Sequence, residues 1–379
     1  MQSKYPKILV ISAWYPNSLH EAEGDFVREQ SRLMHQNGID IRVFHASLSI
    51  RYLLKGIVTR REYKSRQGLN EYVIEMPYWP RNNYWGITKW ANKFKSELVN
   101  YCSSNGWPNI IHAHTYLGGY IASLIKEEKG IPYLVTLHES YILSNKIPKH
   151  HFNLYEKAIQ KADQVVTVGK DLALSLSNIE NVDTVTLPNF IDFSKFQISK
   201  NKFDDFAFIY IGELIERKRV DLLIESFDHI SKILKNGQLY IVGDGPLLHS
   251  LKRKARRLHS KDSVHFIGRL KQKELPNLLS RCHCLVLPSK RESFGIVLAE
   301  AMACGLPFIS TRSGVPEDWF DHDGCKFINH DSTSLKEAML NIQEPFFTLD
   351  PEDIRQNAYE KFSAEVVISK YRKLYSSLI

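Results

Sequence analysis

Short apolar runs alternate with longer amphipathic stretches along most of this chain. The runs are rich in Val and Ile, and they fall into two series. The first series comprises Ile8–Ser12, Ile39–Phe44, Ile110–Ala113, Tyr133–Leu137 and Gln164–Val168. The second series comprises Phe206–Ile211, Leu239–Val242, Val264–Ile267, Cys284–Leu287 and Pro307–Ser310. Strands that alternate with helical patterns predict βαβ units and parallel sheets.

The spacing of the polar segments predicts two domains. The 379 residues exceed the roughly 250–300 at which a single hydrophobic core stops growing. Between the two series, Pro188, Asn189 and the polar stretch near Asn201 indicate a boundary. We therefore expect an N-terminal α/β domain over residues 1–195 and a second over residues 196–350. Residues 351–379 are helical in pattern, and we expect this segment to cross back to the first domain.

Composition is ordinary for a globular protein, with 43% hydrophobic and 24% charged residues. The five cysteines are odd in number and scattered, which indicates a reducing compartment. Cys282 and Cys284 form a C-x-C pair, but His283 is the only further ligand nearby, so we expect core residues on a strand and no metal site. No apolar run reaches the roughly 18 residues of a transmembrane helix. The cytoplasm is therefore the expected location, with peripheral attachment to the inner face of the membrane as a variant.

The net charge of +8 is concentrated in one segment. Residues 51–95 contain ten basic and three acidic residues, a local net charge of +7. The basic residues are Arg51, Lys55, Arg60, Arg61, Lys64, Arg66, Arg81, Lys89, Lys93 and Lys95. Aromatic side chains are interleaved, among them Tyr52, Tyr63, Tyr78, Trp79, Tyr84, Trp85, Trp90 and Phe94. This mixture predicts contact with an anionic partner, and anionic lipid headgroups and nucleic acid both fit it. A solvated face over core aromatics is the alternative.

The segment from Leu287 to Gly305 carries the strongest chemical signal. A predicted strand ends before a loop that contains Glu292, and a helix then begins near Gly295. Backbone N–H groups at such a helix start can bind phosphate. Glu292 and Glu300 flank this turn, and two carboxylates beside an anion site suit the hydroxyls of a nucleotide sugar. Taken from the residues alone, a charge at the helix start for Glu292 and a surface position for Glu300 fit equally well.

These residues resemble a known family. The Glu292–Glu300 pair is similar to the E-x7-E motif of retaining GT-B glycosyltransferases of sequence family 4, and Glu-Ser-Phe-Gly-Ile-Val-Leu resembles its mannosyltransferase-like members. Other matching segments run through nearly the whole chain: Gly24, Ile111–His114, Thr136–Glu139, Leu187–Asn189, Tyr210–Phe227, Ile241–Pro246 and Phe266–Gly268. The resemblance implies the GT-B fold, in which two Rossmann-like domains face each other across a cleft, and no cofactor beyond the nucleotide-sugar substrate.

The resemblance also implies roles for individual residues. Glu292 would hold hydroxyls of the donor sugar, and Glu300 would hold the ribose hydroxyls. Lys218 would neutralise the diphosphate leaving group, and His138 would contact the donor sugar near its anomeric centre. The remaining donor-binding positions, contributed largely by backbone, are Gly24, Gly212, Leu270, Ser293, Phe294, Gly295 and Ile296. His112 and His114 are candidates for the acceptor side.

Three positions depart from the family pattern, and one of them matters most. Arg219 stands in place of the usual Gly after the lysine, and Phe190 stands in place of the Gly of the usual Asn-Gly, which is a milder change. The third departure is at Glu213. The usual Gly-Arg-Leu reads Gly212-Glu213-Leu214, so a carboxylate stands where a second phosphate-binding cation is expected. Arg217 and Arg219 are the candidates to replace it.

The leading prediction is a retaining glycosyltransferase of cell-surface polysaccharide or glycolipid biosynthesis that needs no metal and no nucleic acid. It would move a sugar from a nucleotide-diphosphate sugar to a glycan or lipid-linked acceptor. A GT-B-fold epimerase or phosphorylase is a second enzyme hypothesis, but no matching pattern is visible. The alternative that is not an enzyme is a GT-B protein whose transferase site has decayed. It would act as a basic protein that binds membrane or nucleic acid.

Overall fold

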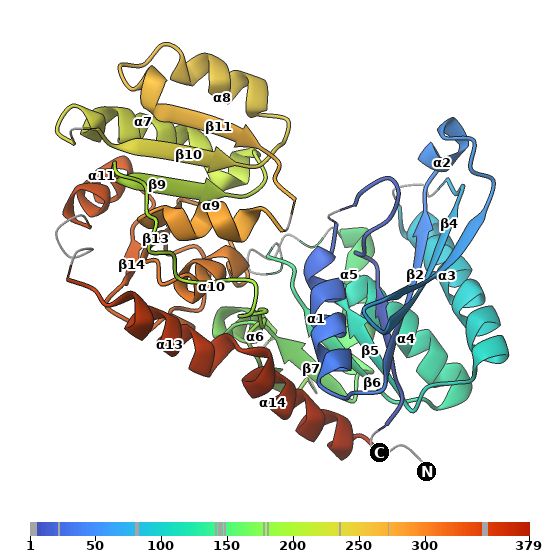
Figure 1. Cartoon of the computed structure of the whole chain (residues 1–379). Coiled ribbons are helices and arrows are strands. Elements are labelled where there is room, and N and C mark those ends of the chain that lie inside the picture. Colours follow the sequence, from blue (N-terminus) through green and yellow to red (C-terminus); the bar gives the residue numbers. More distant parts are fainter. Residues whose placement is uncertain are drawn as a thin grey trace. The chain divides into compact units, whose positions relative to one another are not determined.

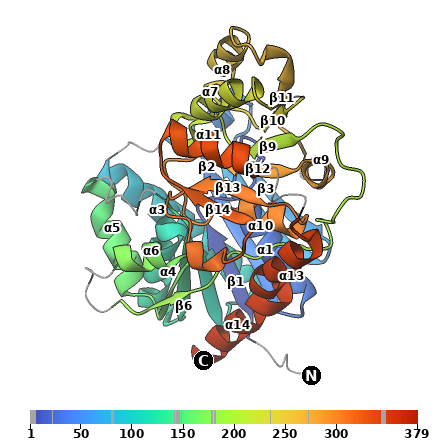
Figure 2. The same ribbon diagram turned by 90° about the vertical axis from the view of Figure 1, so that its left-hand side faces the viewer.

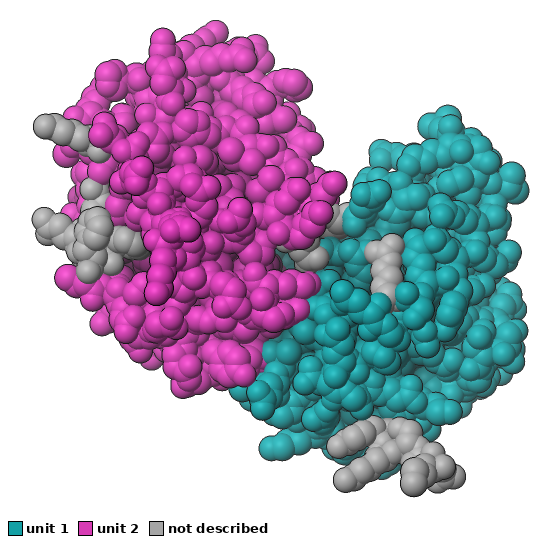
Figure 3. Space-filling view, in the orientation of Figure 1, with its two compact units in different colours: residues 1–190, 364–379 teal, residues 191–363 magenta. Residues whose placement is uncertain are grey.

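The chain folds into two compact units (Figure 3), residues 1–190 with 364–379 and residues 191–363, which we call unit 1 and unit 2. The computed structural model describes residues 6–379 except 22, 80–82, 141, 143–146, 148, 177–178, 180–181, 235, 272 and 343–347, and it does not describe the side chains of Arg66 and His150.

Unit 1 contains a largely parallel sheet. Its described elements are β1 (Ile8–Ser12), α1 (Asp25–Gln36), β2 (Ile41–Leu48), α2 (Arg51–Leu54), β3 (Arg60–Arg66), β4 (Leu69–Met76), α3 (Tyr84–Asn105), β5 (Ile110–His114), α4 (Thr115–Lys129), β6 (Tyr133–Leu137), α5 (Lys149–Gln160), β7 (Gln164–Thr167), α6 (Lys170–Ser175), β8 (Thr184–Thr186) and α14 (Ala364–Ser377). Among the described residues, eight strands pair in the order β3-β4-β2-β1-β5-β6-β7-β8, and only β3 runs antiparallel to its neighbour. Figure 1 labels β2, β4, β5, β6 and β7 of this sheet.

The central strands β1, β5 and β6 of unit 1 bury both faces. On one face, Ile8 and Val10 of β1 pack in a core with residues of α1 and α14. On the other face, α4 lies so close to β6 that a Cβ at Gly119 would come within 2.9 Å of Val135. Because both faces are covered, these strands read as continuous apolar runs rather than as alternating ones.

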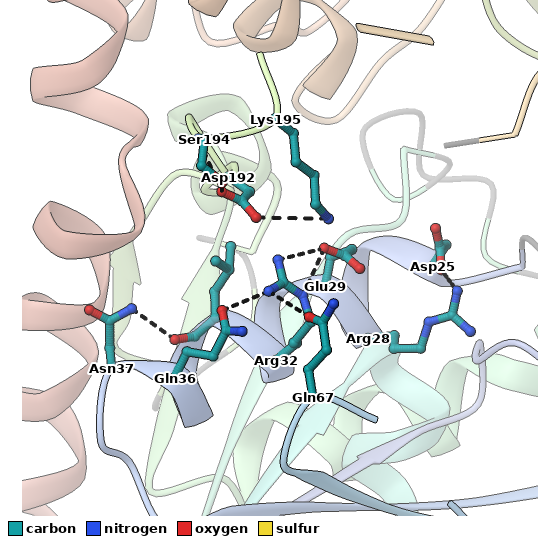
Figure 4. A network of polar contacts seen from close by, with 11 residues as sticks. Asp25, Arg28, Glu29, Arg32, Gln36, Asn37, Gln67, Asp192, Ser194 and Lys195 are labelled. Atoms are coloured by element: carbon teal, nitrogen blue, oxygen red, sulfur yellow. Dashed lines mark hydrogen bonds and ion pairs between the residues drawn. The ribbon is translucent and has the colours of Figure 1, made fainter. Parts of the chain in front are cut away.

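The β3–β4 hairpin is tied to α1 through Arg32. The Arg32 guanidinium donates hydrogen bonds to Glu29 and Gln36 on α1 and to Gln67 in the hairpin turn (Figure 4). Gln67 adopts a positive φ of 51°, and Gly68 follows it at 87°. The side-chain contacts of Arg32 therefore help to hold a turn that is unfavourable for Gln.

Unit 2 is a second doubly wound α/β unit. Its described elements are β9 (Ala207–Ile211), η2 (Glu216–Lys218), α7 (Val220–Ser231), β10 (Gln238–Val242), α8 (Leu248–Ala255), η3 (Lys261–Ser263), β11 (Val264–Gly268), α9 (Leu275–Arg281), β12 (Cys284–Leu287), α10 (Ile296–Ala303), β13 (Phe308–Thr311), η4 (Glu317–Trp319), β14 (Cys325–Ile328), α11 (Ser332–Asn341) and α13 (Pro351–Phe362). Its described strands are all parallel, in the order β11-β10-β9-β12-β13-β14 (Figure 2). Cys282, which precedes β12, and Cys284, its first residue, are both fully buried.

The prediction of two Rossmann-like α/β domains is confirmed. The C-terminal helical stretch is divided at Ser363, so that α13 belongs to unit 2 and α14 to unit 1. The apolar side chains Val367 and Ile368 of α14 are buried in the same core as those of α1.

Candidate functional site

The site in unit 2 lies where the strand order reverses. From β9 the chain adds β10 and β11 on one side and then returns to add β12, β13 and β14 on the other. In open parallel sheets, ligands bind beyond the carboxyl ends of the strands at such a reversal. The loops that follow β9 and β12 therefore form the expected binding edge of this unit.

The loop after β9 is packed tightly against the end of β10 and the loop that follows it. The Gly212 amide donates to the Val242 carbonyl at 3.0 Å, and the Leu214 amide donates to the Asp244 carbonyl at 2.8 Å. A Cβ at Gly243 would lie 1.8 Å from the Gly212 carbonyl oxygen. Glycine is thus required at Gly243 by the fold itself, whether or not a ligand is present.

Lys218 and Glu292 meet at this edge. Lys218 Nζ donates to Glu292 Oε1, and Arg217 Nη1 lies 3.7 Å from Glu292 Oε2. Only 8% of Glu292 is exposed. The two loops are also joined through their backbones, because the Lys290 amide donates to the Arg217 carbonyl at 2.8 Å. Two cations and a carboxylate are therefore assembled at the strand-order reversal.

The loop after β12 prepares the start of α10. Glu292 is held by its amide, which donates to the Ser313 carbonyl at 2.8 Å. Gly295 adopts a φ of 75° and immediately precedes the helix, where an L side chain would be strained. Phe294 is buried among Phe320 and Phe362, with ring centroids 5.8 and 5.6 Å away. At Phe294, only the backbone is therefore placed to meet a ligand.

The remaining positions expected to bind the donor are partly exposed in unit 2. Ser293 and Ile296 are half-buried on either side of Gly295, and Glu300 is half-buried farther along α10. Leu270 is half-buried in the segment that follows β11. These side chains are therefore accessible at the same end of the sheet as Glu292.

The two arginines near Glu213 point to different places. Glu213 is exposed, and its carbonyl accepts a hydrogen bond from Tyr210 Oη at 3.1 Å. Arg219 adopts a φ of 52° and donates to the His330 carbonyl at 2.6 Å. Arg217, in contrast, extends beside Glu292 and donates to the Arg291 carbonyl. Arg217 is therefore the one of the two candidates that lies with the Lys218–Glu292 pair.

Unit 1 has its own reversal of strand order, between β1 and β5. Gly24 directly precedes α1 with a φ of 65°. A Cβ at this position would lie 2.3 Å from the Trp14 carbonyl oxygen. Packing within unit 1 therefore already demands glycine here, and any contact with a ligand is additional.

Three histidines stack on one another: His112 within β5, His114 at its end and His138 directly after β6. The rings of His112 and His114 lie 4.3 Å apart, and those of His114 and His138 lie 5.2 Å apart. His112 is completely buried, and its ring nitrogens contact Tyr375 Oη at 2.7 Å and Thr136 Oγ1 at 2.8 Å. Both nitrogens of His112 are thus engaged inside the unit, which leaves neither for an acceptor in this arrangement.

His114 and His138 are bonded to each other at the carboxyl edge. His114 Nδ1 lies 2.9 Å from His138 Nε2, and the Phe26 ring packs edge-on against His138. Burial lowers the pKa of His138 to about 3 and the pKa of His114 well below its usual range. Both rings are therefore neutral at physiological pH. His138 can form hydrogen bonds there but carries no positive charge.

Glu139 was not assigned a role from the sequence, although it is the last residue of the matching Thr136–Glu139 segment. Its carboxylate is buried and accepts hydrogen bonds from the Tyr116 amide at 2.8 Å and the His138 amide at 2.9 Å. Burial raises the pKa of Glu139 to about 7. The carboxylate therefore ties the start of α4 to the end of β6.

The basic and aromatic segment 51–95 also contains exposed apolar side chains. Leu54 is 88% exposed and Trp85 is 73% exposed, and the other large apolar side chains exposed here are Leu53, Val58, Tyr63 and Trp79. Arg81 and the side chain of Arg66 lie outside the described residues. Among the described residues, no helix has both the length and the apolar character needed to cross a bilayer.

Four of these exposed side chains, Leu53, Leu54, Val58 and Trp79, lie in segments that follow neighbouring strands of the unit 1 sheet. Strands β2 and β4 are parallel neighbours, and the Ser49 amide after β2 donates to the Met76 carbonyl at the end of β4. The segment with Leu53, Leu54 and Val58 follows β2, and Trp79 follows β4. They therefore emerge at the carboxyl edge of the sheet.

Two family models together match residues 24–361. Glycosyltransferase Family 4 matches residues 24–195, and Glycosyl transferases group 1 matches residues 192–361. The Bacillus subtilis glycosyltransferase TuaC, named for teichuronic acid biosynthesis, is 28% identical over 397 residues and covers 97% of this chain and 96% of its own. N-acetyl-alpha-D-glucosaminyl L-malate synthase of Bacillus anthracis is 28% identical over 289 residues, covering 72% and 75%.

Solved structures share the fold over almost the whole chain. Sucrose-phosphate synthase of Thermosynechococcus elongatus has a TM-score of 0.79 at 18% identity and covers 98% of this chain and 99% of its own. Anabaena HepE in complex with UDP-glucose has a TM-score of 0.76 at 16% identity, covering 98% and 100%. Both share the GT-B fold, with its two Rossmann-like domains.

Proposed function

This chain belongs to the group 1 glycosyl transferases of the GT-B fold, and from that premise we propose that it moves a sugar from a nucleoside-diphosphate sugar to a glycan or lipid-linked acceptor with retention of anomeric configuration. The observation that carries the proposal is the meeting of Lys218 and Glu292 at the reversal of strand order in unit 2. A cation and a carboxylate side by side suit a ligand that joins a phosphate to hydroxyls.

In this proposal the donor spans the loops of unit 2. Glu300 accepts hydrogen bonds from the ribose hydroxyls, and Leu270 borders the base. The backbone N–H groups at the start of α10 and the Lys218 ammonium face the diphosphate, where the helix dipole also favours negative charge. Glu292 accepts hydrogen bonds from sugar hydroxyls.

In the protein without donor, the Lys218–Glu292 ion pair neutralises a buried carboxylate. A carboxylate that is 8% exposed would be costly if it were left unpaired. When donor binds, its diphosphate attracts Lys218 and Arg217, while its hydroxyls satisfy Glu292. Arg217 thereby supplies the second positive charge that Glu213 does not provide at its position.

The transfer step breaks the bond between the anomeric carbon and the diphosphate oxygen and forms a bond from that carbon to an acceptor oxygen. We infer a front-face reaction, in which the acceptor proton passes to the departing diphosphate oxygen. Lys218, Arg217 and the α10 N–H groups stabilise the developing negative charge. Glu139 is a poor candidate for a covalent nucleophile, because both of its oxygens accept backbone hydrogen bonds. His138, neutral and at the edge of unit 1, would contact the sugar.

The likeness to TuaC supports a cell-surface polysaccharide as the product, and the UDP-glucose complex of HepE makes UDP-sugars the first donors to test. Purified protein would be incubated with a panel of nucleotide sugars and lipid-linked or oligosaccharide acceptors, and the products analysed by mass spectrometry and proton NMR. We expect a product with the anomeric configuration of the donor, formed also in the presence of EDTA. An inverted product, or activity abolished by EDTA and restored by magnesium, would contradict the proposal.

We further propose that unit 1 attaches to an anionic membrane through the exposed segment that begins with α2. Leu53, Leu54 and Val58 form an exposed apolar group beside the basic residues Arg51 and Lys55. Basic residues near an anionic surface contribute roughly 1 kcal/mol each, and apolar side chains add to that by insertion. An enzyme with a lipid-linked acceptor needs such access to the headgroup plane.

Several other basic residues of the segment are already paired. Arg60 and Lys64 contact Glu62, and Arg61 contacts Glu97. Their substitution is therefore expected to weaken membrane binding less than substitution at the apolar group.

Co-sedimentation with vesicles tests the attachment. Binding should increase with the fraction of anionic lipid and decrease with salt. The variant Leu53→Ser/Leu54→Ser should bind at least roughly tenfold more weakly, given about 0.8 kcal/mol per buried CH₂ group. Arg256→Ser/Arg257→Ser, which removes two exposed charges from unit 2, is the control and should bind like the parent. No sedimentation with anionic vesicles at low salt would refute the attachment and favour a soluble acceptor.

A further inference from the structure

The positive charge of the chain is not confined to residues 51–95. Residues 247–273 of unit 2 contain nine basic residues and one acidic residue, Asp262. The rest of the chain, outside these two segments, therefore has a net negative charge. A concentration of one sign of charge on a folded unit attracts partners of the opposite sign.

Helix α8 presents three arginines of this segment on one side. Leu251 and Ala255 are buried, so the side of α8 that carries them packs against the rest of unit 2. Arg253 lies two positions from each of them and hence on the opposite side of the helix. Arg256 keeps helical dihedral angles at the end of α8, and Arg257 follows it. All three arginines are exposed, and we call them the α8 arginine face.

The α8 arginine face is not neutralised within unit 2. Two neighbouring lysines have partners: Lys254 pairs with Glu225, and Lys252 Nζ lies 5.9 Å from the centroid of the Phe266 ring. None of the three arginines of the face forms an ion pair in the part of the chain that the structure describes. Their charges are therefore available to an anionic partner.

Further cations lie at the two ends of the neighbouring edge strand. β11 is the outermost strand of the unit 2 sheet, and α8 lies beside it in Figure 1 and Figure 2. Lys261 precedes β11, and Arg269 and Lys271 follow it; all three are exposed and form no ion pair among the described residues. A strand of five residues spans about 17 Å. The cations therefore extend over a length that suits a polymer better than a single small anion.

The composition of the segment favours a polymer of carboxylates as the partner. Guanidinium groups form paired hydrogen bonds with carboxylates. Single-stranded nucleic acid is bound with the help of exposed aromatic rings, whereas Phe266 is the one Phe, Tyr or Trp of the segment and is half-buried. Attachment to a bilayer is strengthened by inserted apolar side chains, but among the described residues of the segment only Ile267 is an exposed large apolar one, at 39%.

We propose that the α8 arginine face and the cations that flank β11 form a docking surface for an acidic glycan, a polymer with carboxylates on its sugars. This inference rests on the proposed function, because it takes the glycan to be the acceptor. In the sheet, β10 alone separates β11 from β9, the strand that leads to Lys218. Neighbouring strands are about 4.8 Å apart, so the ends of β11 and β9 lie about 10 Å apart. One polymer can therefore contact the docking surface while its end lies at the donor site.

Calorimetry with polygalacturonate, a polymer of uronic acid, tests the docking surface. We expect the parent to bind polygalacturonate, to bind digalacturonate at least roughly tenfold more weakly because it meets fewer cations at once, and not to bind neutral dextran. In Arg253→Gln/Arg256→Gln/Arg257→Gln, the affinity for polygalacturonate should fall at least roughly tenfold. The slope of log K against log salt should become shallower by about 2–3, since three contacts with the polymer are lost. No binding of polygalacturonate by the parent at low salt would overturn the inference.

The matched control removes the same number of charges elsewhere in unit 2. Lys200→Gln/Lys232→Gln/Lys326→Gln changes three exposed residues outside the segment. Because salt screens the charges that are far from the polymer, this variant should bind polygalacturonate within about threefold of the parent. An equal loss of affinity in both triple variants would show that only the net charge matters, and it would overturn the docking surface.

Two further ligands decide the class of partner. Tighter binding of single-stranded RNA than of polygalacturonate by the parent would overturn the assignment to an acidic glycan. Vesicle sedimentation should be unchanged in the arginine triple variant, as in the Arg256→Ser/Arg257→Ser control, because the face lacks apolar side chains for insertion. A loss of vesicle binding in either variant would assign the face to the membrane and overturn the inference.

Transfer assays separate this inference from the proposed function. For an acidic polymeric acceptor, kcat/KM should fall roughly tenfold in the arginine triple variant through a higher KM, while a short neutral acceptor is used as by the parent. Unchanged polymer affinity and transfer in this variant, or a parent that transfers only to neutral acceptors, would overturn the docking surface and leave the proposed function intact. A parent without transferase activity would overturn the proposed function, and calorimetry with polygalacturonate would still test the surface.

Discussion

Lys218 and Glu292 form an ion pair although they are 74 residues apart in the chain. They follow β9 and β12, which are adjacent strands at the reversal of strand order. The side chains are largely buried, with 14% and 10% exposure. The pair is therefore both an element of the folded unit and the candidate centre of its chemistry.

Loss of the Lys218 charge should weaken diphosphate binding. Lys218→Met keeps the apolar stem but removes the ammonium, so the affinity for a nucleoside diphosphate should fall roughly 10- to 100-fold while the affinity for the nucleoside changes little. Isothermal titration calorimetry with both ligands measures this difference. An equal loss for nucleoside and nucleoside diphosphate would place Lys218 away from the phosphates.

Glu292 should matter more for turnover than for nucleotide affinity. In Glu292→Ala, kcat should fall by roughly 10²–10³, the size seen for lost transition-state contacts, because hydroxyls of the reacting sugar lose their acceptor. Calorimetric affinity for the free nucleotide should change far less. A variant with parental kcat and weakened nucleotide binding would contradict this division.

Glu300 should bind the ribose hydroxyls of the nucleotide. Glu300→Ala is expected to weaken the binding of nucleotide sugar and of free nucleotide alike, by roughly tenfold for a charged hydrogen-bond acceptor. Glu337→Ala on the exposed face of α11 is the control and should bind both ligands like the parent. Affinities that Glu300→Ala leaves unchanged would remove the ribose role.

Arg217 and Arg219 should behave differently despite their proximity in sequence. Arg217→Gln is expected to lower diphosphate affinity roughly tenfold, because Arg217 lies beside Glu292. Arg219→Gln should leave that affinity unchanged, because Arg219 bonds the His330 carbonyl instead. Diphosphate titrations of the two variants test the difference directly, and the opposite ranking would show that Arg219 replaces the missing cation.

Glu139 should make the stability of the protein depend on pH. Burial raises the pKa of its carboxyl to about 7 from a usual value of 4.5, so between these values the folded state holds a proton that the unfolded chain has lost. The free energy of unfolding contributed by Glu139 therefore decreases as pH rises from about 4.5 to 7, by roughly 2–4 kcal/mol. Urea unfolding at pH 5 and pH 8 should show this decrease in the parent relative to Glu139→Gln. If the difference between the two proteins were the same at both pH values, the raised pKa would be refuted.

Much of the fold could be read from the order of apolar runs. The predicted strands Tyr133–Leu137 and Cys284–Leu287 have the observed bounds of β6 and β12. The β3–β4 hairpin was not predicted, because β3 carries charged residues such as Arg60 and Lys64 at an exposed sheet edge. Edge strands of this kind lack the apolar periodicity on which the prediction depends.

Only part of the candidate site could be predicted from the sequence. The motif identified Glu292, Glu300 and Lys218 as candidates, but it did not distinguish Arg217 from Arg219. In the structure Arg217 lies beside Glu292, whereas Arg219, with a positive φ of 52°, donates to the His330 carbonyl. Likewise, no local pattern predicted the left-handed conformation of Thr115, which has a φ of 68°.

The sequence by itself determined which segments are apolar on one or both faces, and hence two α/β units and the loops that end their strands. Tertiary structure decided which distant residues meet: Tyr375 of α14 covers His112, 263 residues away, and His114 is left to contact His138. The physical reason is that buried positions recur at regular intervals along each helix or strand, so they appear in the sequence as a periodic pattern of apolar residues. A contact between separate elements depends on the packing of the whole unit, and neither segment shows it as a pattern of its own.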